Sequence, residues 1–380
     1  MPDKHAILSA SGSHRWLECT PSAMLEARVQ DMGSPYAAEG TVAHEIAATF
    51  LEGKPVSNLI LEDSDVYSPA MLDHADAYRD FVQEQLAEAK KDDPMATLLV
   101  ERRLDFSDYV PEGFGTGDAV IVSDGMLRVI DYKYGQGVKV EAHGNSQMRL
   151  YALGALSEFG YLYNVEKVST TIFQPRLGWI DTEILTTEEL LAWGQHVKEI
   201  AAIAAKGEGD RKAGAHCKFC KVADRCPVLA AYQLETVARA FDEPEELSDS
   251  EIAEIVLKKK DFEGWLKRIC DYALNQAIYH NVSFPGMKLV AGTSRRTITK
   301  PAELVAYCVN HQLAKESQLY KPRELITLGD LEKLIGPKIV AMELDEFIKK
   351  PEGKPTLVSV KDKRPEWSAE KSIIKQFEED

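Results

Sequence analysis

The sequence predicts a mixed α/β fold of the α+β type, in which a mixed central sheet is flanked by helices. Three segments rich in branched residues, at 97–104, 117–122 and 126–133, are typical of strands. Segments in which apolar residues recur at helical spacing lie on both sides of them. The predicted order along the chain is α-β-β-β-α-β, which is typical of a layered α/β structure.

The part of the chain before the first strand is predicted to hold two helices. The first 35 residues contain Ser, Gly and Pro breaks around Trp16 to Cys19, so we expect them to be irregular. Apolar residues at helical spacing predict one helix at 41–51 and a second at 69–90.

The strands and helices that follow have clear start and turn signals. Ser123-Asp124-Gly125 separates the second and third strands and is a good hairpin turn, so we expect a three-stranded meander. Helical spacing at 145–159 precedes expected strands at 167–173 and 179–185. A helix expected at 187–205 begins with Thr-Thr-Glu-Glu, whose acidic first turn suits a helix N-terminus.

The composition is that of a folded protein without a membrane span. The 380 residues are 44% hydrophobic and 28% charged, which are ordinary values for a globular chain. No apolar run approaches the roughly 20 residues that a membrane span needs, and the first residues lack the order of a signal peptide. We therefore expect a cytoplasmic protein, in which cysteines stay mostly reduced.

The net charge of −16 argues against a protein that coats nucleic acid through bulk electrostatics, because phosphate binding relies on cationic surface. A local basic channel could still hold DNA on an acidic protein. Each candidate cation alone is more often a solvated surface charge. The candidates are Arg102, Arg103, Lys139, Arg149, Arg211, Lys212, Lys218 and Lys221.

Two carboxylates and one amine are predicted to converge on the hairpin. Asp118 lies near the start of one strand, and Asp131-Tyr132-Lys133 ends the next. Because strand side chains alternate, Asp131 and Lys133 share a face, while Tyr132 points away and leaves its carbonyl near that face. Such a set can bind Mg²⁺ or Mn²⁺ and hydrolyse a phosphodiester. Alternatively, an isolated Asp-x-Lys is a surface ion pair of little value.

The surrounding motifs resemble those of the PD-(D/E)XK nucleases, in particular the RecB-like branch. Gly115-Thr-Gly-Asp118 and Asp131-Tyr-Lys133 match the central motifs, and Gln147-Met-Arg-Leu-Tyr151 matches the Q-x-x-x-Y motif, whose two residues share a helix face. Upstream, His44 matches the helical histidine of these nucleases. The resemblance implies a restriction-endonuclease-like core.

The resemblance also implies roles for these residues. It implies a metal site whose ligands are His44, Asp118, Asp131 and the carbonyl of Tyr132. Lys133 would position the attacking water, and Gln147 and Tyr151 would hold DNA or brace the site. Glu101, on the preceding strand, is a further acidic candidate.

A second group of residues has the spacing of metal ligands. Cys217-Lys-Phe-Cys220 is followed by Cys226, and three thiols this close are a strong sign of zinc or an iron–sulfur cluster. On spacing alone the two cofactors are equally favoured, with Cys19 or His216 as the fourth zinc ligand.

The order of the cysteines favours the cluster. Trp16-x-x-Cys19-x-Pro21 resembles the N-terminal cysteine of AddB-like and other iron–sulfur RecB-type nucleases. In that branch one cysteine precedes the nuclease motifs and three follow, so the resemblance implies a 4Fe-4S cluster with an architectural role. Cys270 and Cys308 lie in helical, apolar contexts and are expected to be buried thiols.

The resemblance covers about residues 10 to 230 and is closest to phage-encoded RecB-like exonucleases of the DUF2800 type. It implies an exonuclease core at 1–235, acting on linear single- or double-stranded DNA ends in phage recombination or end processing, with a single-strand annealing or DNA-binding partner in the host cytoplasm. It leaves 236–380 as a mostly helical extension, with α+β pieces after about 285, that could bind DNA or a partner.

Two other functions stay open at this stage. A non-catalytic DNA-binding or assembly module could retain the fold, and a structure-specific endonuclease, or a nuclease acting on RNA, could share the motifs. No Walker-type phosphate loop occurs in the sequence, so we expect no ATPase activity.

Overall fold

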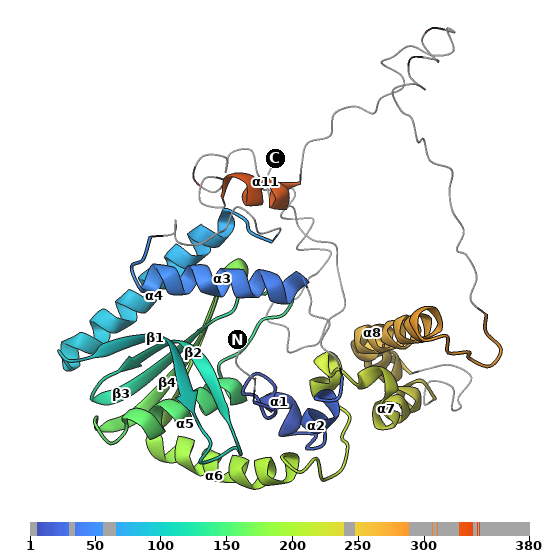
Figure 1. The fold of residues 1–380 in the computed structure, drawn as a ribbon, viewed down its shortest axis with the longest axis horizontal. Coiled ribbons are helices and arrows are strands. Elements are labelled where there is room, and N and C mark those ends of the chain that lie inside the picture. The colour runs from blue at the N-terminus through green and yellow to red at the C-terminus, as the bar shows by residue number, and fades with distance from the viewer. Residues whose placement is uncertain are drawn as a thin grey trace.

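The computed structural model describes residues 6–29, 35–55, 66–238, 248–288 and 327–336, and the single residues 306, 310, 340 and 342. A five-stranded sheet with helices on both faces forms the centre of this part of the chain (Figure 1). The mixed α+β fold predicted from the sequence is confirmed. None of the helices among the described residues combines the length and apolar composition of a membrane span.

The sheet has the order β1-β2-β3-β4-β5. The first three strands form the predicted antiparallel meander, β4 runs parallel to β3, and β5 is antiparallel to β4. A parallel neighbour needs a crossover, which the helix between β3 and β4 provides. The strands are β1 (Thr97–Asp105), β2 (Phe114–Val122), β3 (Gly125–Tyr132), β4 (Val165–Gln174) and β5 (Trp179–Thr186).

Two helical layers bury opposite faces of the sheet. Helices α5 (Ser146–Phe159) and α6 (Thr187–Ala204) pack with Val120 on one face. Helices α3 (Pro35–Leu51) and α4 (Ala70–Asp92) pack with Ala119 on the other. Neighbouring residues of a strand point to opposite faces, so the stretch 119–122 of β2, which is covered on both sides, is apolar throughout.

Helices α5 and α6 begin with side-chain caps, and the cap of α6 includes the acidic first turn noted in the sequence. The Thr186 hydroxyl accepts from the Glu189 amide, while the Glu189 carboxylate accepts from the Thr186 amide, which forms a capping box. Asn145 caps α5 by accepting from the amides of Gln147 and Met148. The second cap fixes the start of the helix that carries Gln147.

The N-terminal segment differs from the prediction. It was expected to be irregular, but it forms two short helices, α1 (Ser13–Trp16) and α2 (Ser22–Glu26). Trp16 is almost completely buried in the same core as α5. Helix α3 also starts at Pro35 rather than at residue 41, and proline suits a first helical position.

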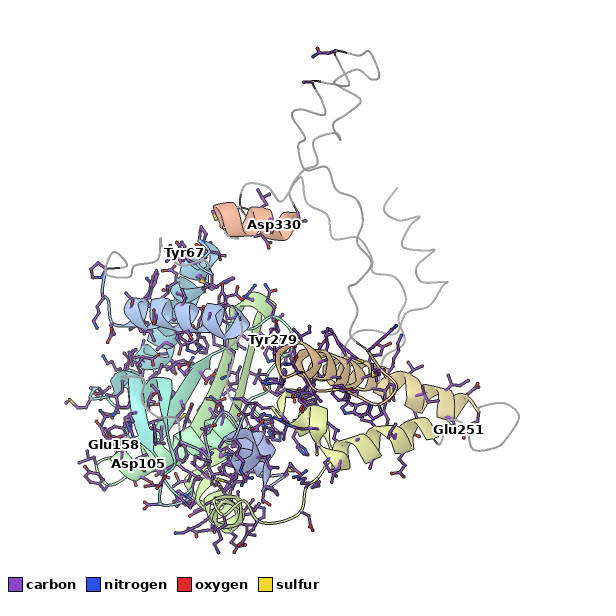
Figure 2. All side chains as sticks on the ribbon, turned by 45° about the vertical axis from the view of Figure 1, so that its right-hand side comes forward. Tyr67, Asp105, Glu158, Glu251, Tyr279 and Asp330 are labelled. Carbon is purple, nitrogen blue, oxygen red and sulfur yellow. The ribbon has the colours of Figure 1, made fainter. Side chains whose placement is uncertain are left out.

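The predicted extension is only partly within the described residues. Helix α7 (Pro227–Ala238) and the long helix α8 (Asp249–Tyr279) follow the cysteine segment, and α11 (Leu328–Ile335) contacts α4. Figure 2 shows Glu251 at the end of α8 that lies far from the sheet. Most of the α+β pieces expected after residue 285 lie outside the described residues.

Candidate active site

The hairpin strands diverge at the predicted site, and a carboxylate fills the gap between them. The register of β2 and β3 ends with the pair Ala119 and Ile130. Beyond this pair the amide of Tyr132 donates to Oδ2 of Asp118 at 2.7 Å, in place of a backbone acceptor. Asp118 is therefore fixed in the fork between the two strands.

Asp131 and Lys133 lie side by side, as strand alternation predicts. Nζ of Lys133 is 2.9 Å from Oδ2 of Asp131 and donates to Oε1 of Gln147 at 3.2 Å. The backbone amide of Lys133 donates to the Phe173 carbonyl at 2.9 Å, which holds this end of β3 against β4. The lysine is thus positioned by the sheet and by α5 together.

Gln147 and Tyr151 come from one face of α5. Nε2 of Gln147 donates to Oδ1 of Asp131 at 3.4 Å and to the Tyr151 hydroxyl at 3.2 Å. A Cβ at Gly115 would lie 2.5 Å from a ring carbon of Tyr151, so only glycine leaves room for the ring there. The glycine-containing motif and the Q-x-x-x-Y motif therefore meet physically.

His44 and Glu101 reach the same fork from two other elements. Nδ1 of His44, on α3, is 3.2 Å from Oδ1 of Asp118. Ligand atoms of His44, Glu101 and Asp118 all lie within 4.8 Å of one another, close enough to hold one metal ion. Glu101 had been only an additional candidate, and the geometry brings it into the group.

Glu101 has an unusual backbone conformation for a strand residue. It lies opposite Asp118, between the pairs Val100–Ala119 and Arg102–Gly117, and its φ is +48°. A residue other than glycine in this region costs on the order of 1–3 kcal/mol, and such strain is found where function requires it.

The ionisable groups of the site perturb one another. Although Glu101 is exposed as a residue, desolvation of its carboxyl and the charge of Asp118 raise its pKa to about 7. Burial raises the pKa of Asp131, and although Lys133 lowers it, Asp118 raises it further. Three carboxylates thus share a small volume with too little positive charge, which favours a bound cation.

On the two basic groups of the site, burial and the neighbouring carboxylates have opposite effects on the pKa. Burial lowers the pKa of Lys133, but the charges of Asp131 and Asp118 outweigh burial and raise it above its usual value. Burial also lowers the pKa of His44, and the charge and hydrogen bond of Asp118 more than offset it.

The donor set fits a hard divalent ion. It offers carboxylate oxygens and one imidazole, which suit Mg²⁺ or Mn²⁺. Among the described residues, Oδ2 of Asp131 meets no hydrogen-bond donor at an acceptable angle, although Nζ of Lys133 is near. A buried carboxylate oxygen rarely stays unsatisfied, so this atom is available to a ligand.

Tyr132 separates the fork from the apolar core. Its ring packs against Tyr78 at a centroid distance of 4.8 Å and meets the His44 ring edge-on at 5.5 Å. Burial raises the pKa of its hydroxyl well beyond the ordinary value. The side chain points away from the carboxylates, as predicted, while the predicted role of its carbonyl as a ligand stays a prediction.

Two acidic residues of β5 that no motif indicated hold the start of α5 and the loop before it. The buried Glu183 accepts from Arg149 and from the Gly144 amide, and Asp181 accepts from the Ala142 amide at 2.7 Å. The alternation of Asp181 and Glu183 on one face of β5 was a usable signal for this anchoring.

The four cysteines of the second predicted site come from both ends of the core. Cys19 follows α1, while the others lie on the segment of short 3₁₀ helices before α7. Burial raises the pKa of the Cys217 thiol, and the nearby Cys19 and Cys226 raise it further. Burial also raises the pKa of Cys220 to about 11. A bound metal would favour the thiolate forms against this cost. Among the described residues, no three of these thiols lie within 4.8 Å of one another.

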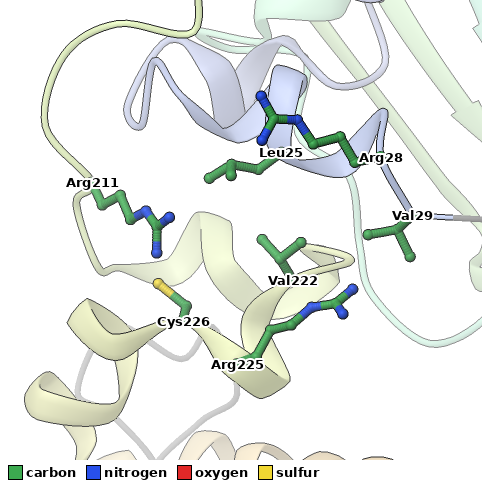
Figure 3. A pocket seen from close by; sticks show the side chains of 7 residues that line it. All are labelled: Leu25, Arg28, Val29, Arg211, Val222, Arg225 and Cys226. Atoms are coloured by element: carbon green, nitrogen blue, oxygen red, sulfur yellow. The ribbon is translucent and has the colours of Figure 1, made fainter. Parts of the chain in front are cut away.

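Hydrogen bonds join the N-terminal segment to the cysteine segment. The Lys221 amide donates to Oε1 of Glu26 at 2.7 Å, and the Thr20 hydroxyl donates to the Glu208 carbonyl at 2.6 Å. A cavity of about 290 Å³ lies between the two segments. Figure 3 shows its lining side chains, which are Leu25, Arg28, Val29, Arg211, Val222, Arg225 and Cys226.

Some predictions about the remaining residues change. Cys270 was expected to be a buried thiol, but it is exposed, because α8 buries only a narrow strip that includes Trp265. Cys308 lies outside the described residues.

A family model described as "Protein of unknown function (DUF2800)" matches residues 5–365. Among solved structures, a protein of Eubacterium rectale described as a "putative exonuclease" is 10% identical, with a TM-score of 0.32, over 63% of this chain and 90% of that one. A protein named SSO0001 is 16% identical, with a TM-score of 0.23, over 57% and 96%. Both TM-scores are low, so these two structures define neither fold nor function here.

Proposed function

The chain belongs to the family described as protein of unknown function (DUF2800), and from its site we propose that it is a metal-dependent nuclease that hydrolyses DNA. One observation carries the proposal: ligand atoms of His44, Glu101 and Asp118 converge within 4.8 Å, next to the ion pair of Asp131 and Lys133. Acidic ligands beside a positioned amine are the groups that phosphodiester hydrolysis requires.

In this proposal the metal ligands are His44, Asp118, Asp131 and the Tyr132 carbonyl, with Glu101 as an additional carboxylate. A bound Mg²⁺ or Mn²⁺ would neutralise charge on the phosphate and lower the pKa of a bound water. The chain itself contributes the preset positions of these oxygens, because Asp118 is tied to the Tyr132 amide.

Lys133 would act as a fixed positive charge. The pKa of its amine is raised by Asp131 and Asp118, so it stays protonated at neutral pH. A protonated amine orients a water molecule and stabilises negative charge on the phosphate, and it takes up no proton. Gln147, which accepts from Lys133 and donates to Tyr151, keeps the amine aimed into the site.

We further propose the finer assignments that the motifs imply. The core, residues 1–235, would be a RecB-like member of the PD-(D/E)XK superfamily that degrades linear DNA from an end, in the host cytoplasm during phage recombination. A single-strand annealing or DNA-binding protein would be its partner. Residues 236–380 would bind DNA or that partner.

The cysteines Cys19, Cys217, Cys220 and Cys226 would hold a 4Fe-4S cluster, with structural zinc as the alternative. The hydrogen bond from the Lys221 amide to Glu26 joins the segment of Cys19 to the segment of the other three cysteines, and this supports a bound group of either kind. Metal analysis of anaerobically purified protein separates them: about four irons per chain and a brown colour support the cluster. One zinc in a colourless protein rejects it.

A cleavage assay tests the nuclease proposal. Purified protein with Mg²⁺ or Mn²⁺ should degrade linear DNA, and Asp131→Ala and Lys133→Ala should abolish this, while the exposed-site controls Asp108→Ala and Lys167→Ala should not. Activity that persists in the first pair would show that this site does not cut DNA. Closed circular DNA separates an endonuclease from an exonuclease.

A non-catalytic DNA-binding module is the second candidate. It is favoured only if the folded wild-type protein binds DNA and never cuts it with either ion.

A further inference from the structure

A groove of about 590 Å³ opens beside the candidate metal site. Two of its lining residues, Glu101 and Tyr151, belong to that site, and the remainder come from β1, β2 and the N-terminal segment before α1. The volume lies within the range of pockets that hold one small molecule. It can admit one nucleotide, but it is too small for a base pair with both backbones.

One wall of the groove is a stacked pair. The guanidinium carbon of Arg103 lies 3.8 Å from the centroid of the Phe114 ring. The two residues are on neighbouring strands, where Arg103 pairs with Thr116 and Asp105 pairs with Phe114. Arg103 is exposed, and both residues of the pair line the groove.

Arg103 differs from its neighbour in how its charge is compensated. Arg102, on the opposite face of β1, forms an ion pair with Glu158. Among the ion pairs between described residues, none includes Arg103. Its charge acts on Asp105, two residues further along β1, without forming an ion pair, so its guanidinium donors are available to an anionic ligand.

The groove has the groups that an unpaired nucleotide requires. A guanidinium supported by an aromatic ring offers a flat surface for a base and donors for a phosphate. The hydroxyl-bearing residues Ser9, Ser11 and Thr116 line the groove as well. Glu101 is the one carboxylate among the lining residues, and a cation in the metal site would offset its repulsion of a phosphate.

We propose that this groove binds one unpaired nucleotide of the DNA strand, with its base stacked on the Arg103–Phe114 pair. The inference rests on the proposed nuclease function and adds the substrate class to it. A base held in a duplex is already stacked on its neighbours and cannot turn onto the pair. The protein therefore prefers single-stranded DNA, or an end with an unpaired overhang, to a blunt duplex.

Binding of a fluorescein-labelled strand, alone and annealed to its complement, tests this preference. Fluorescence anisotropy with Ca²⁺ in place of Mg²⁺ gives Kd values for Phe114→Leu, Arg103→Lys and the control Arg102→Lys. Loss of stacking should weaken single-strand binding by about tenfold in the first two and change duplex binding by less than about threefold. The control should match the wild type for both probes.

Phe114→Tyr retains the ring and should retain the affinity. This variant, together with thermal melting of each protein, excludes a general folding effect as the cause of weaker binding. Equal losses for both probes, or no loss, overturn the stacking inference while leaving a DNA-cutting wild type, and thus the nuclease proposal, intact. A wild-type protein that neither binds nor cuts DNA overturns both.

Discussion

Two regions of this molecule gather potential metal ligands from distant parts of the chain, and they do so by different means. In the fork of β2 and β3, the hydrogen bond from Tyr132 to Asp118 spans 14 residues, so the hairpin register brings Asp118 and Asp131 together. His44 and Glu101 join them from α3 and β1. In the cysteine region, the bond from Lys221 to Glu26 spans 195 residues. The second arrangement requires a complete core before its ligands can meet.

The two regions also differ in how much apolar packing surrounds them. The fork lies between two extensive apolar layers, whereas the cysteine cluster of buried residues consists of Cys220, Ala223, Leu229 and Trp265. Its links to the N-terminal segment include the exposed pair Lys212–Glu18, and exposed pairs contribute little to stability. We therefore expect the fork to be set by the fold and the cysteine region to depend on its bound group.

The largest expected effect is on catalysis at the fork. Asp118→Asn retains an acceptor for the Tyr132 amide and removes the charge, so DNA cleavage should fall by about a hundredfold to a thousandfold with little change in melting temperature. Single-turnover cleavage with Mn²⁺ measures it. Near-normal cleavage by the folded variant would place the chemistry elsewhere.

The second-largest expected effect is a loss of stability that is confined to the cysteine region. Cys217→Ser should weaken the bound group, and a loss of about 2 kcal/mol lowers Tm by about 5 °C in a core of this size. Hydrogen exchange should rise in residues 212–226 and stay unchanged in 118–133. The exposed Cys270→Ser is the control and should change neither. A uniform rise over both stretches would mean that the regions are not independent.

A smaller effect concerns the contact between the two motifs of the fork. Gly115→Ala places a methyl group against the Tyr151 ring, which must move and disturb Gln147 and Lys133. Small displacements in a site are costly, so we expect cleavage to fall about tenfold. Gly40→Ala, in α3 with no neighbour near its Cβ position, should retain full activity and gain up to about 1 kcal/mol of stability.

The smallest effect is a dependence on pH. The pKa of Glu101 is about 7 in the folded protein and 4.5 in an ordinary environment, so between these values the folded state holds a proton that the unfolded chain has lost. Raising the pH across this window therefore destabilises the metal-free protein. Glu101→Gln should reduce the trend in Tm, with the remainder coming from His44 and Asp131, and the exposed Glu112→Gln should leave it unchanged.

The pH dependence of stabilisation by a metal ion tests the role of Glu101 further. Ionised Glu101 is the form that binds a cation, so added Mn²⁺ should stabilise the wild type more above pH 7 than below it. Equal stabilisation at both pH values would remove Glu101 from the ligand set.

Strands and most helices could be predicted from the sequence because their patterns are local. The branched runs at 97–104 and 126–133 match β1 and β3 closely, because branched residues favour the extended backbone of a strand. The short helices α1 and α2 were missed, because helices of four or five residues form through tertiary packing and leave little periodic signal.

The residues of the candidate site that belong to local sequence motifs could be predicted. Asp118, Asp131 and Lys133 could be related by hairpin alternation, and Gln147 and Tyr151 by helix periodicity. Glu101 could not be ranked, because its place opposite Asp118 and its left-handed backbone depend on the register of β1. The exposure of Cys270 depends on which side of α8 meets its neighbours, which spacing alone does not define.

Calorimetric titration of Mn²⁺ into wild-type protein, Asp118→Asn and Cys217→Ser tests whether the fork binds the metal. We expect Mn²⁺ to bind at the fork in the wild type, with the same affinity in the cysteine variant and an affinity at least about tenfold weaker in Asp118→Asn. Equal affinity in the wild type and Asp118→Asn would show that the metal does not bind at the fork.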